Sequence, residues 1–261
     1  MSEAALSVTL LCCTPQPELA VALGARLCYS DSDIAALRDE LEPKSEALVE
    51  RLMSYGHLSP IEHASFTFGV EGVSRALLAQ LTRHRIASFS VQSQRYVAKR
   101  EGTDYVLPPS IRALGEEAVA EYEKQMRQIN SYYAYWLDKG VAAEDARFLL
   151  PNAAETRLVM TMNARELGHF FSLRCCRRAQ WEIRRLAWIM LGIVRREAPA
   201  LFRNAGPGCL RGGCAEGKMS CKQAAKVKEL DAALNALAQE KADDEAILKW
   251  VMENIGNAGK E

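Results

Sequence analysis

The segment 179–196 most restricts how this chain can fold. Its apolar side chains surround the helix axis instead of forming one stripe, and they include Trp181, Ile183, Leu186, Trp188, Met190 and Ile193. A helix that is apolar on nearly every side is usually buried at the centre of a domain. No stretch of the chain approaches the roughly 18 apolar residues of a membrane helix. We therefore expect 179–196 to be a central helix with other elements packed around it.

Patterns on either side predict a mixture of strands and helices. Residues 65–70 alternate, with Phe66, Phe68 and Val70 on one face, which is typical of a half-buried strand. Strands are also expected at 7–13 and 156–162, and Gly72 is expected to end the strand at 65–70. Expected helices are 17–27, 34–41, 45–55, one from an N-cap at Ser74 to about His84, 111–138, a shorter helix before Pro151, and one from Asn163 toward Cys175. The expected class is α+β, with a small, mostly antiparallel sheet packed with long helices.

The composition changes after Pro207. Residues 206–221 are rich in Gly and Cys, and two apolar stripes follow them. The stripes are Val227, Leu230, Leu234 and Leu237, then Ile247, Leu248, Val251 and Ile255. We interpret 1–205 as the main domain and 206–261 as a Gly/Cys-rich loop with an amphipathic helical extension, an appendage to the main domain.

The charges balance over the whole chain but not locally. Lys plus Arg equals Asp plus Glu at 33 each, so net charge favours neither nucleic acid nor a membrane surface. Between residues 140 and 205, however, there are eleven arginines and no lysine. The planar guanidinium binds phosphates and flat rings through two hydrogen bonds, although many of these side chains could form ordinary surface ion pairs.

The cysteines indicate a reducing compartment. The first residues lack the pattern of a secretory signal, and the adjacent Cys12 and Cys13 are poorly placed for disulfides, so we expect a cytoplasmic protein with reduced thiols. Cys209, Cys214 and Cys221 could wrap a zinc ion. They contain no Cys-x-x-Cys pair, and no histidine follows residue 170 to complete the usual four ligands. We therefore expect no metal.

The densest functional pattern lies between His57 and Tyr96. Arg83-His84-Arg85 is followed by a stretch of small hydroxyl residues that contains Ser93 and Arg95. If this stretch is an extended loop beside the arginines, backbone N–H, hydroxyl and guanidinium groups can bind a phosphate together. His57 and His63 could be site groups or hydrogen-bonded residues near a strand end.

These residues resemble the flavin-dependent thymidylate synthases. The defining motif of that family is Arg-His-Arg, seven residues and then Ser, which Arg83-His84-Arg85 and Ser93 match without a gap. Flanking positions also agree, and the similarity covers roughly residues 8–205, which would be the catalytic domain. The further matches are Glu62-His63, Gln80, Arg95-Tyr96, Arg147 before Leu150-Pro151, Asn163-Ala164-Arg165, His169, Arg174 and Ala179-Gln180-Trp181-Glu182.

The resemblance implies a role for each matching residue. The implied flavin-binding residues are Ser59, Arg83, His84, Arg85, Val91, Asn163, Arg165 and His169. The implied nucleotide-binding residues are Gln80, Arg83, Ser93, Gln94, Arg95, Arg147 and Arg174, and Arg174 is the implied catalytic residue that polarises the pyrimidine. Two positions depart from the family: Val91 replaces a frequent acidic residue, so only its backbone can contact the flavin, and His169 stands where other members can have Asn.

The implied reaction is the methylation of dUMP to dTMP. Carbon C5 of uracil becomes reactive either after a thiolate adds to C6 or when the ring's negative charge is stabilised without a covalent bond. None of the eight cysteines lies in the matched motif, which favours the second route. Ser93 could be a nucleophile, but no general base accompanies it, so a phosphate or ring contact is preferred.

The resemblance also implies the partners. They are FAD, 5,10-methylenetetrahydrofolate as carbon donor and NADPH as reductant, in a homotetramer whose flavin sites are shared between subunits. No Gly-x-Gly-x-x-Gly fingerprint is present, so a Rossmann site is not expected. Two alternatives remain: a flavoprotein reductase that has lost methyl transfer, and a helical nucleotide or RNA binder whose binding would depend steeply on salt.

Overall fold

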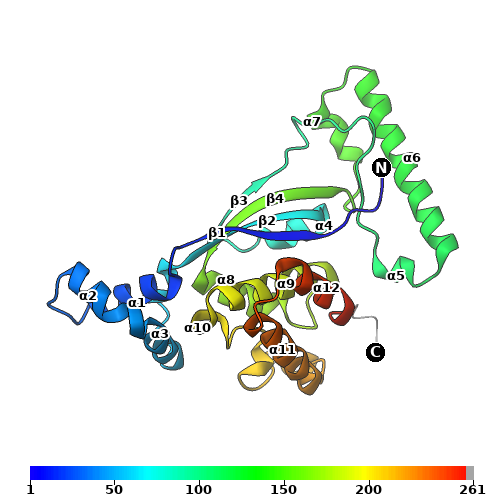
Figure 1. The fold of residues 1–261 in the computed structure, drawn as a ribbon. Helices are drawn as coiled ribbons and strands as arrows, with labels where there is room; N and C mark the ends of the chain where they lie inside the picture. The colour runs from blue at the N-terminus through cyan, green and yellow to red at the C-terminus, as the bar shows by residue number, and fades with distance from the viewer. Residues whose placement is uncertain (257–261) are drawn as a thin grey trace.

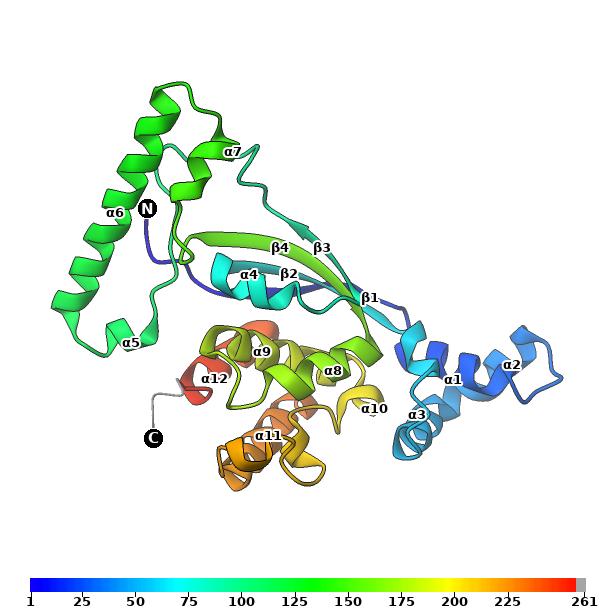
Figure 2. The ribbon, with the colours of Figure 1, turned by 180° about the vertical axis from the view of Figure 1, so that it is seen from behind.

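The computed structural model of the chain describes residues 1–256 and shows an antiparallel sheet with helices below it and at both of its ends (Figures 1 and 2). The sheet has the strand order β1-β2-β4-β3, and every neighbouring pair is antiparallel. The expected α+β class with a small antiparallel sheet is therefore confirmed. The strands are β1 (Ser7–Cys13), β2 (Ser65–Ser74), β3 (Ala87–Val91) and β4 (Glu155–Asn163).

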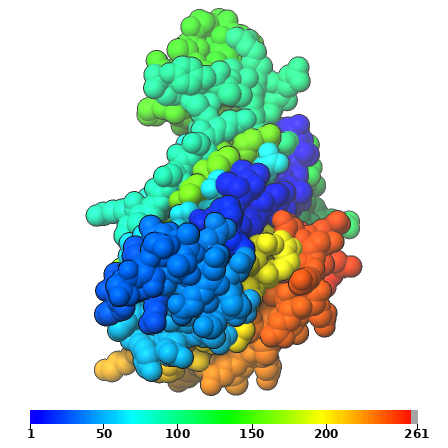
Figure 3. Space-filling model, turned by 60° about the vertical axis from the view of Figure 1, so that its left-hand side comes forward, coloured from blue at the N-terminus to red at the C-terminus, as the bar shows by residue number. Residues whose placement is uncertain are grey.

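The two faces of the sheet differ as the alternation in β2 predicts. Phe66, Phe68 and Val70 are fully buried on the face that meets the helices. On the opposite face the hydroxyls of Thr67 and Thr161 lie 2.9 Å apart, in a hydrogen bond between β2 and β4. This second face is open in Figure 3, where the sheet crosses the middle of the molecule in dark blue and green.

The helices form three groups around the sheet. One group lies at each end, and the third packs below the sheet (Figures 1 and 2). At one end of the sheet are α1 (Pro17–Leu27), α2 (Ile34–Leu41) and α3 (Ser45–Ser54). At the other end are α5 (Pro109–Arg112), α6 (Glu116–Asp138) and α7 (Ala143–Ala146). Below the sheet are α4 (Arg75–Leu81), α8 (Ala164–Arg174), α9 (Trp181–Glu197), α10 (Pro199–Phe202), α11 (Ala224–Gln239) and α12 (Asp244–Asn254).

The prediction of one long helix from 111 was wrong at its start. Two helices occupy this region, because Gly115 has a φ of 103° that a right-handed helix does not accommodate. The predicted end near Gly140 is confirmed, since α6 ends at Asp138.

Helix α9 is the buried central helix that its composition predicts. It packs against α4, α8, α10, α11, α12 and β1. Trp188 is only 2% exposed, and its Nε1 donates a hydrogen bond to the Cys175 carbonyl oxygen at 3.0 Å. The neighbours expected on every side of this helix are therefore present.

The C-terminal helices belong to the main core. Val227 and Leu234 of α11 and Ile247 and Val251 of α12 are buried in the same hydrophobic cluster as Phe66 of the sheet. The interpretation of this region as a mere appendage was therefore wrong for residues 206–256, because both apolar stripes are packed against α9. The last residues of the predicted extension, 257–261, lie outside the described residues, and the division at residue 205 stays a prediction.

No helix among residues 1–256 combines the length and the hydropathy that are needed to cross a membrane.

Gly72 was expected to end strand β2, and this prediction was wrong. The residue instead forms an irregularity inside the strand. The register with β4 shifts between Val70 and Val73, and the strand continues to Ser74. Gly72 has a φ of +70°, and a Cβ atom there would lie 1.9 Å from the Ala5 carbonyl oxygen. Only glycine fits this position without movement of the backbone.

Gly72→Ala is expected to destabilise the protein by roughly 2–3 kcal/mol, because left-handed strain and a backbone clash act together. The matched control is Gly140→Ala, where φ is +84° but nothing lies within 4 Å of the added Cβ. This control isolates the strain and is expected to cost roughly 1 kcal/mol. Urea unfolding at one protein concentration measures both losses, and equal losses would contradict the clash.

Candidate functional site

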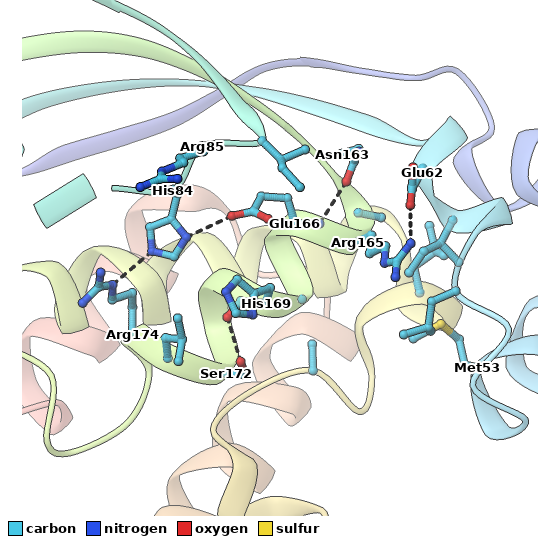
Figure 4. Close-up of a pocket in the computed structure, with 18 of the residues that line it drawn as sticks. Met53, Glu62, His84, Arg85, Asn163, Arg165, Glu166, His169, Ser172 and Arg174 are labelled. Carbon is cyan, nitrogen blue, oxygen red and sulfur yellow. Dashed lines mark hydrogen bonds and ion pairs between the residues drawn. The ribbon is translucent and has the colours of Figure 1, made fainter. Parts of the chain in front are cut away.

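A cavity of about 1070 Å³ lies where α8 begins and the chain leaves α4. Its apolar walls include Ile61, Leu173 and Leu201. Half of the predicted site residues line it: Arg83, His84, Arg85, Asn163, Arg165, His169 and Arg174. The fold thus brings together two motifs that are about 80 residues apart in the sequence, and Figure 4 shows them on facing segments.

Helix α4 is anchored so that the segment after it passes over the cavity. Ser74 is the N-cap, as predicted, and its Oγ accepts a hydrogen bond from Leu77 N at 3.0 Å. Ser74 N and Oγ donate to the two carboxylate oxygens of Glu182 on α9, at 2.7 and 2.6 Å. Burial raises the pKa of Glu182, and these two hydrogen bonds oppose the rise. The helix ends at Leu81, so Arg83–Arg85 lie in the turn that follows it and not in its last turn.

The first turns of α8 supply the opposite wall. The helix starts next to Asn163, as predicted; Asn163 is its N-cap, and its Oδ1 accepts from Glu166 N at 2.9 Å. Arg165 and His169 are four residues apart, so they lie on the same face of the helix. Arg165 Nη1 donates to Glu62 Oε1 (Figure 4).

The cavity carries positive charge that residues 1–256 do not neutralise. Arg83, Arg85 and Arg211 line it, and none of them forms an ion pair within this range. The Arg165 charge, by contrast, is matched by Glu62. Unpaired guanidinium groups beside apolar walls favour a ligand with both phosphate groups and a flat, weakly polar ring.

Arg174, His84 and Glu166 form a chain of hydrogen bonds along the cavity (Figure 4). Arg174 Nε donates to His84 Nε2 at 3.1 Å, and His84 Nδ1 lies 3.0 Å from Glu166 Oε1. Arg174 Nη2 also reaches the Gln80 carbonyl oxygen at 3.5 Å. Burial lowers the pKa of His84, and the nearby Arg174 lowers it further, although the hydrogen bond to Glu166 acts in the opposite direction. His84 is therefore neutral near pH 7.

Four predicted nucleotide-binding residues lie elsewhere. Ser93 and Gln94 line a second, much smaller hollow next to Tyr133 and Leu150. Arg95 Nε donates to Glu144 Oε2 at 2.9 Å, and Arg147 Nε donates to the Glu144 carbonyl oxygen at 3.0 Å. These four residues form a second group near α7.

The expectation that Ser93 and Arg95 lie beside Arg83–Arg85 in one chain was wrong. Residues 88–91 belong to the stretch that was expected to be a loop, but with Ala87 they form β3 and pair with 158–162 of β4. A strand of this length spans roughly 17 Å, and β3 carries the chain away from the cavity toward α7 (Figures 1 and 2).

The remaining predicted residues do not line the cavity. Ser59 precedes the short 3₁₀ helix Pro60–His63, whose Ile61 and Glu62 do line it. Gln80 contributes its carbonyl oxygen to Arg174. Val91 ends β3 and packs against the main hydrophobic core. His57 and His63 are exposed, and neither lines the cavity.

Three charged residues that line the cavity were not predicted as site residues: Glu62, Glu166 and Arg211. Glu166 had a local signal, because Asn163 and Glu166 have the spacing of a capping box, in which the acid would bond back to the N-cap. Its carboxylate turns instead to His84. Glu62 was one of the positions that match the family but was given no role. Arg211 had no comparable signal; it comes from the Gly/Cys-rich segment after the short helix Gly208–Leu210.

No cysteine lines the cavity, and all eight, which lie within residues 1–256, are free thiols. Burial raises the pKa of Cys176 and of Cys209. The nearby Glu216 raises that of Cys176 further, Cys176 raises that of Cys209, and Cys214 and Cys221 add to both. Within residues 1–256, no group of three or more His, Cys, Asp or Glu side chains is arranged to hold a metal ion. The expectation of no zinc stays a prediction.

Comparison with known proteins agrees with the motifs. A family model described as thymidylate synthase complementing protein matches residues 9–200. The chain is 56% identical over 227 residues to a flavin-dependent thymidylate synthase of Geobacter sulfurreducens, an alignment that covers 86% of this chain and 97% of the relative. It is 48% identical to the protein of the same name from Clostridium tetani, over 86% of this chain and 96% of that one.

A solved structure is also similar. It is a UMP/dUMP methylase, PolB, of Streptomyces cacaoi, which was crystallised with 5-Br dUMP. The TM-score is 0.67 at 27% sequence identity, over 77% of this chain and 94% of that one.

Proposed function

Since this chain belongs to the flavin-dependent thymidylate synthase family, we propose that it methylates dUMP to dTMP. In this proposal 5,10-methylenetetrahydrofolate is the carbon donor, reduced FAD the hydride donor, and NADPH the reductant of the flavin. The observation that carries the proposal is the single cavity that gathers Arg83–Arg85 with Asn163, Arg165, His169 and Arg174. The similar PolB structure, with its bound 5-Br dUMP, supports the choice of nucleotide.

The residues around the cavity fit FAD. A volume of about 1070 Å³ is large enough for a dinucleotide. Apolar walls suit a flat ring, and Arg83, Arg85 and Arg211 offer unpaired positive charge for a pyrophosphate. When bound, reduced FAD supplies the hydride for the new methyl group.

Arg174 suits the role of polarising the pyrimidine. Its guanidinium lines the cavity, and the hydrogen bonds to His84 and Gln80 use Nε and Nη2. The Nη1 group is left with both of its donors, and Nη2 keeps one, so a pair of parallel hydrogen bonds is possible to the pyrimidine anion, at its deprotonated ring nitrogen N3 and the neighbouring carbonyl oxygen. Such donors stabilise negative charge on the ring without a covalent bond to the enzyme.

The proposed active site is shared between subunits of a homotetramer. Ser93, Gln94, Arg95 and Arg147 form a group that is separate from the cavity of their own chain. Association would let this group meet the cavity of another copy. Large apolar side chains that a monomer leaves exposed support association: Ile86 at 68%, Tyr96 at 80% and Phe148 at 83%.

The proposed reaction needs no cysteine nucleophile. We therefore expect every single replacement of the eight cysteines by Ser or Ala to leave methylation detectable. The buried Cys175 is best replaced by Ala, because burial already raises the pKa of its thiol well above the ordinary value and a hydroxyl there would lack a partner. Product formation by each flavin-loaded variant is the measurement, and complete loss in one folded variant would contradict the non-covalent route.

A direct assay tests the proposal as a whole. The purified protein is expected to be yellow and to form dTMP from dUMP, methylenetetrahydrofolate and NADPH, as measured by chromatography. Oxidation of NADPH without dTMP would indicate the flavoprotein reductase instead. A colourless protein that binds RNA with a steep salt dependence would indicate the binding module. We also propose a cytoplasmic location, which the eight free thiols support.

A further inference from the structure

Glu166 is a carboxylate at the cavity wall that the proposed chemistry does not use. It lies on α8 and is 7% exposed. Its Oε1 atom is 3.0 Å from His84 Nδ1, and no arginine or lysine pairs with it within residues 1–256. Burying a carboxylate without an opposite charge costs free energy, which the hydrogen bond from His84 offsets only in part.

The hydrogen bonds determine which tautomer of His84 is present. Arg174 Nε carries a hydrogen, so His84 Nε2 must be the acceptor in their 3.1 Å contact. A neutral imidazole has one N–H, which therefore resides on Nδ1 and is donated to Glu166. The Glu166 carboxylate can only accept, so it selects the tautomer that also accepts from Arg174.

We propose that Glu166 is a positioning residue, which acts through the His84 imidazole to hold the Arg174 guanidinium in its orientation at the cavity. The proposal rests on the proposed role of Arg174 in the reaction. The rings of His84 and Phe170 pack edge to face with centroids 5.0 Å apart, which limits rotation of the imidazole. Both ring nitrogens of His84 are occupied, so any contact of this residue with the flavin must use its backbone or ring face.

The chain of hydrogen bonds also has a defined pH dependence. The charged or titratable groups that face His84 are Glu166, Arg174 and His169. Burial lowers the pKa of His84 from its ordinary 6.5, so the folded protein binds fewer protons than the unfolded chain below that pH. The contacts are therefore complete above pH 6.5 and are lost as the pH falls through the lower folded value, because a protonated imidazole cannot accept from Arg174.

Glu166→Gln tests this role with little change in shape. An amide can both donate and accept, so it no longer selects the tautomer, and removing the carboxylate charge lowers the pKa of His84 further. We expect kcat to fall by about 10- to 100-fold, by analogy with carboxylates that orient metal-binding imidazoles, whose removal has an effect of this size. We expect the flavin content to stay at the wild-type level and the acid limb of the pH profile to move to lower pH.

Glu62→Gln is the matched control. It removes another carboxylate from the same cavity, but Glu62 pairs with Arg165 and does not contact His84. The acid limb of the pH profile of Glu62→Gln is expected to lie at the wild-type pH, even if the substitution changes kcat. Wild-type kcat and an unmoved acid limb in Glu166→Gln would overturn the proposal.

A second measurement depends neither on enzymatic activity nor on whether Glu166→Gln folds. ¹⁵N NMR of histidine-labelled wild-type protein reports the tautomer of each of the four histidines, with His84 assigned by comparison with His84→Gln. A neutral imidazole with its hydrogen on Nδ1 at pH 7.5 is expected. An imidazole with its hydrogen on Nε2, or a charged one, would refute the positioning role. If the wild type makes no dTMP, this spectrum still determines the tautomer of His84. A failure of the proposed function can therefore be distinguished from a failure of the proposed role of Glu166.

Discussion

Arg174→Ala is expected to lower kcat for dTMP formation by about 10²–10³-fold or more, the usual loss when one fixed donor to a developing negative charge is removed. The flavin content is expected to stay near that of the wild type, because Arg83, Arg85, Asn163 and Arg165 still line the cavity. The measurements are dTMP formation by chromatography and flavin content by visible absorbance of the same preparation.

Arg174→Lys separates charge from geometry. An ammonium group keeps the charge but cannot form the paired, planar contact, and it cannot reproduce the anchoring of Nε to His84. We expect it to recover less than about a tenth of wild-type kcat, a loss of more than 1.4 kcal/mol of transition-state stabilisation. Full activity in the Lys variant would refute the bidentate argument.

The control for both substitutions is Arg178→Ala. Arg178 follows α8 and is exposed, and it does not line the cavity. Its replacement removes a nearby positive charge without touching the site, and activity is expected to be unchanged. A similar loss in this variant would mean that the general charge of the region, and not Arg174, determines the rate.

Arg195→Ala is expected to destabilise the protein by about 3–5 kcal/mol, the range observed when one partner of a buried ion pair is removed. Arg195 is 2% exposed in α9. Its guanidinium donates to the carbonyl oxygens of Phe202 and Ala205 at 3.2 and 2.7 Å, and to Asp231 Oδ1 at 2.6 Å. The variant leaves these acceptors without their donor and weakens the attachment of α11 to α9.

Arg127→Ala is the matched control, because its guanidinium is exposed on α6 and lies 3.5 Å from Glu123. Exposed pairs of this kind contribute at most about 1 kcal/mol. Urea unfolding at one fixed protein concentration measures both variants, since association would otherwise alter the apparent stability. Equal effects of the two substitutions would show that the extension is not held through Arg195.

Local patterns in the sequence determined much of the fold. The bounds of β1, α1 and α2 were predicted to the residue, as was the N-cap Ser74, and the start of α8 was predicted at its N-cap Asn163. Each of these features depends on side chains within one or two turns of each other, so the sequence contains the necessary information. The motif likewise identified most of the charged residues at the cavity, because the Arg-His-Arg triplet and its spacing to Ser93 are themselves properties of the sequence.

Tertiary contacts decided the rest. Residues 87–91 are a strand because β4 pairs with them; Ala87, Phe89 and Val91 alternate with Ser88 and Ser90, but a run of five residues is too short to specify a strand by itself. Helices α11 and α12 joined the main core because α9 offers them an apolar surface, which an amphipathic stripe alone cannot specify.

The hydrogen bonds of the site depend on the same long-range packing. Glu166 and Arg174 meet His84 across 82 and 90 residues of sequence. The spacing of Asn163 and Glu166 alone would favour a different partner for Glu166, the backbone of the N-cap. The sequence by itself determined which chemical groups are available and which short segments form helices and strands. Only the tertiary structure decided which of those groups meet, because burial and hydrogen-bond geometry depend on how distant segments pack together.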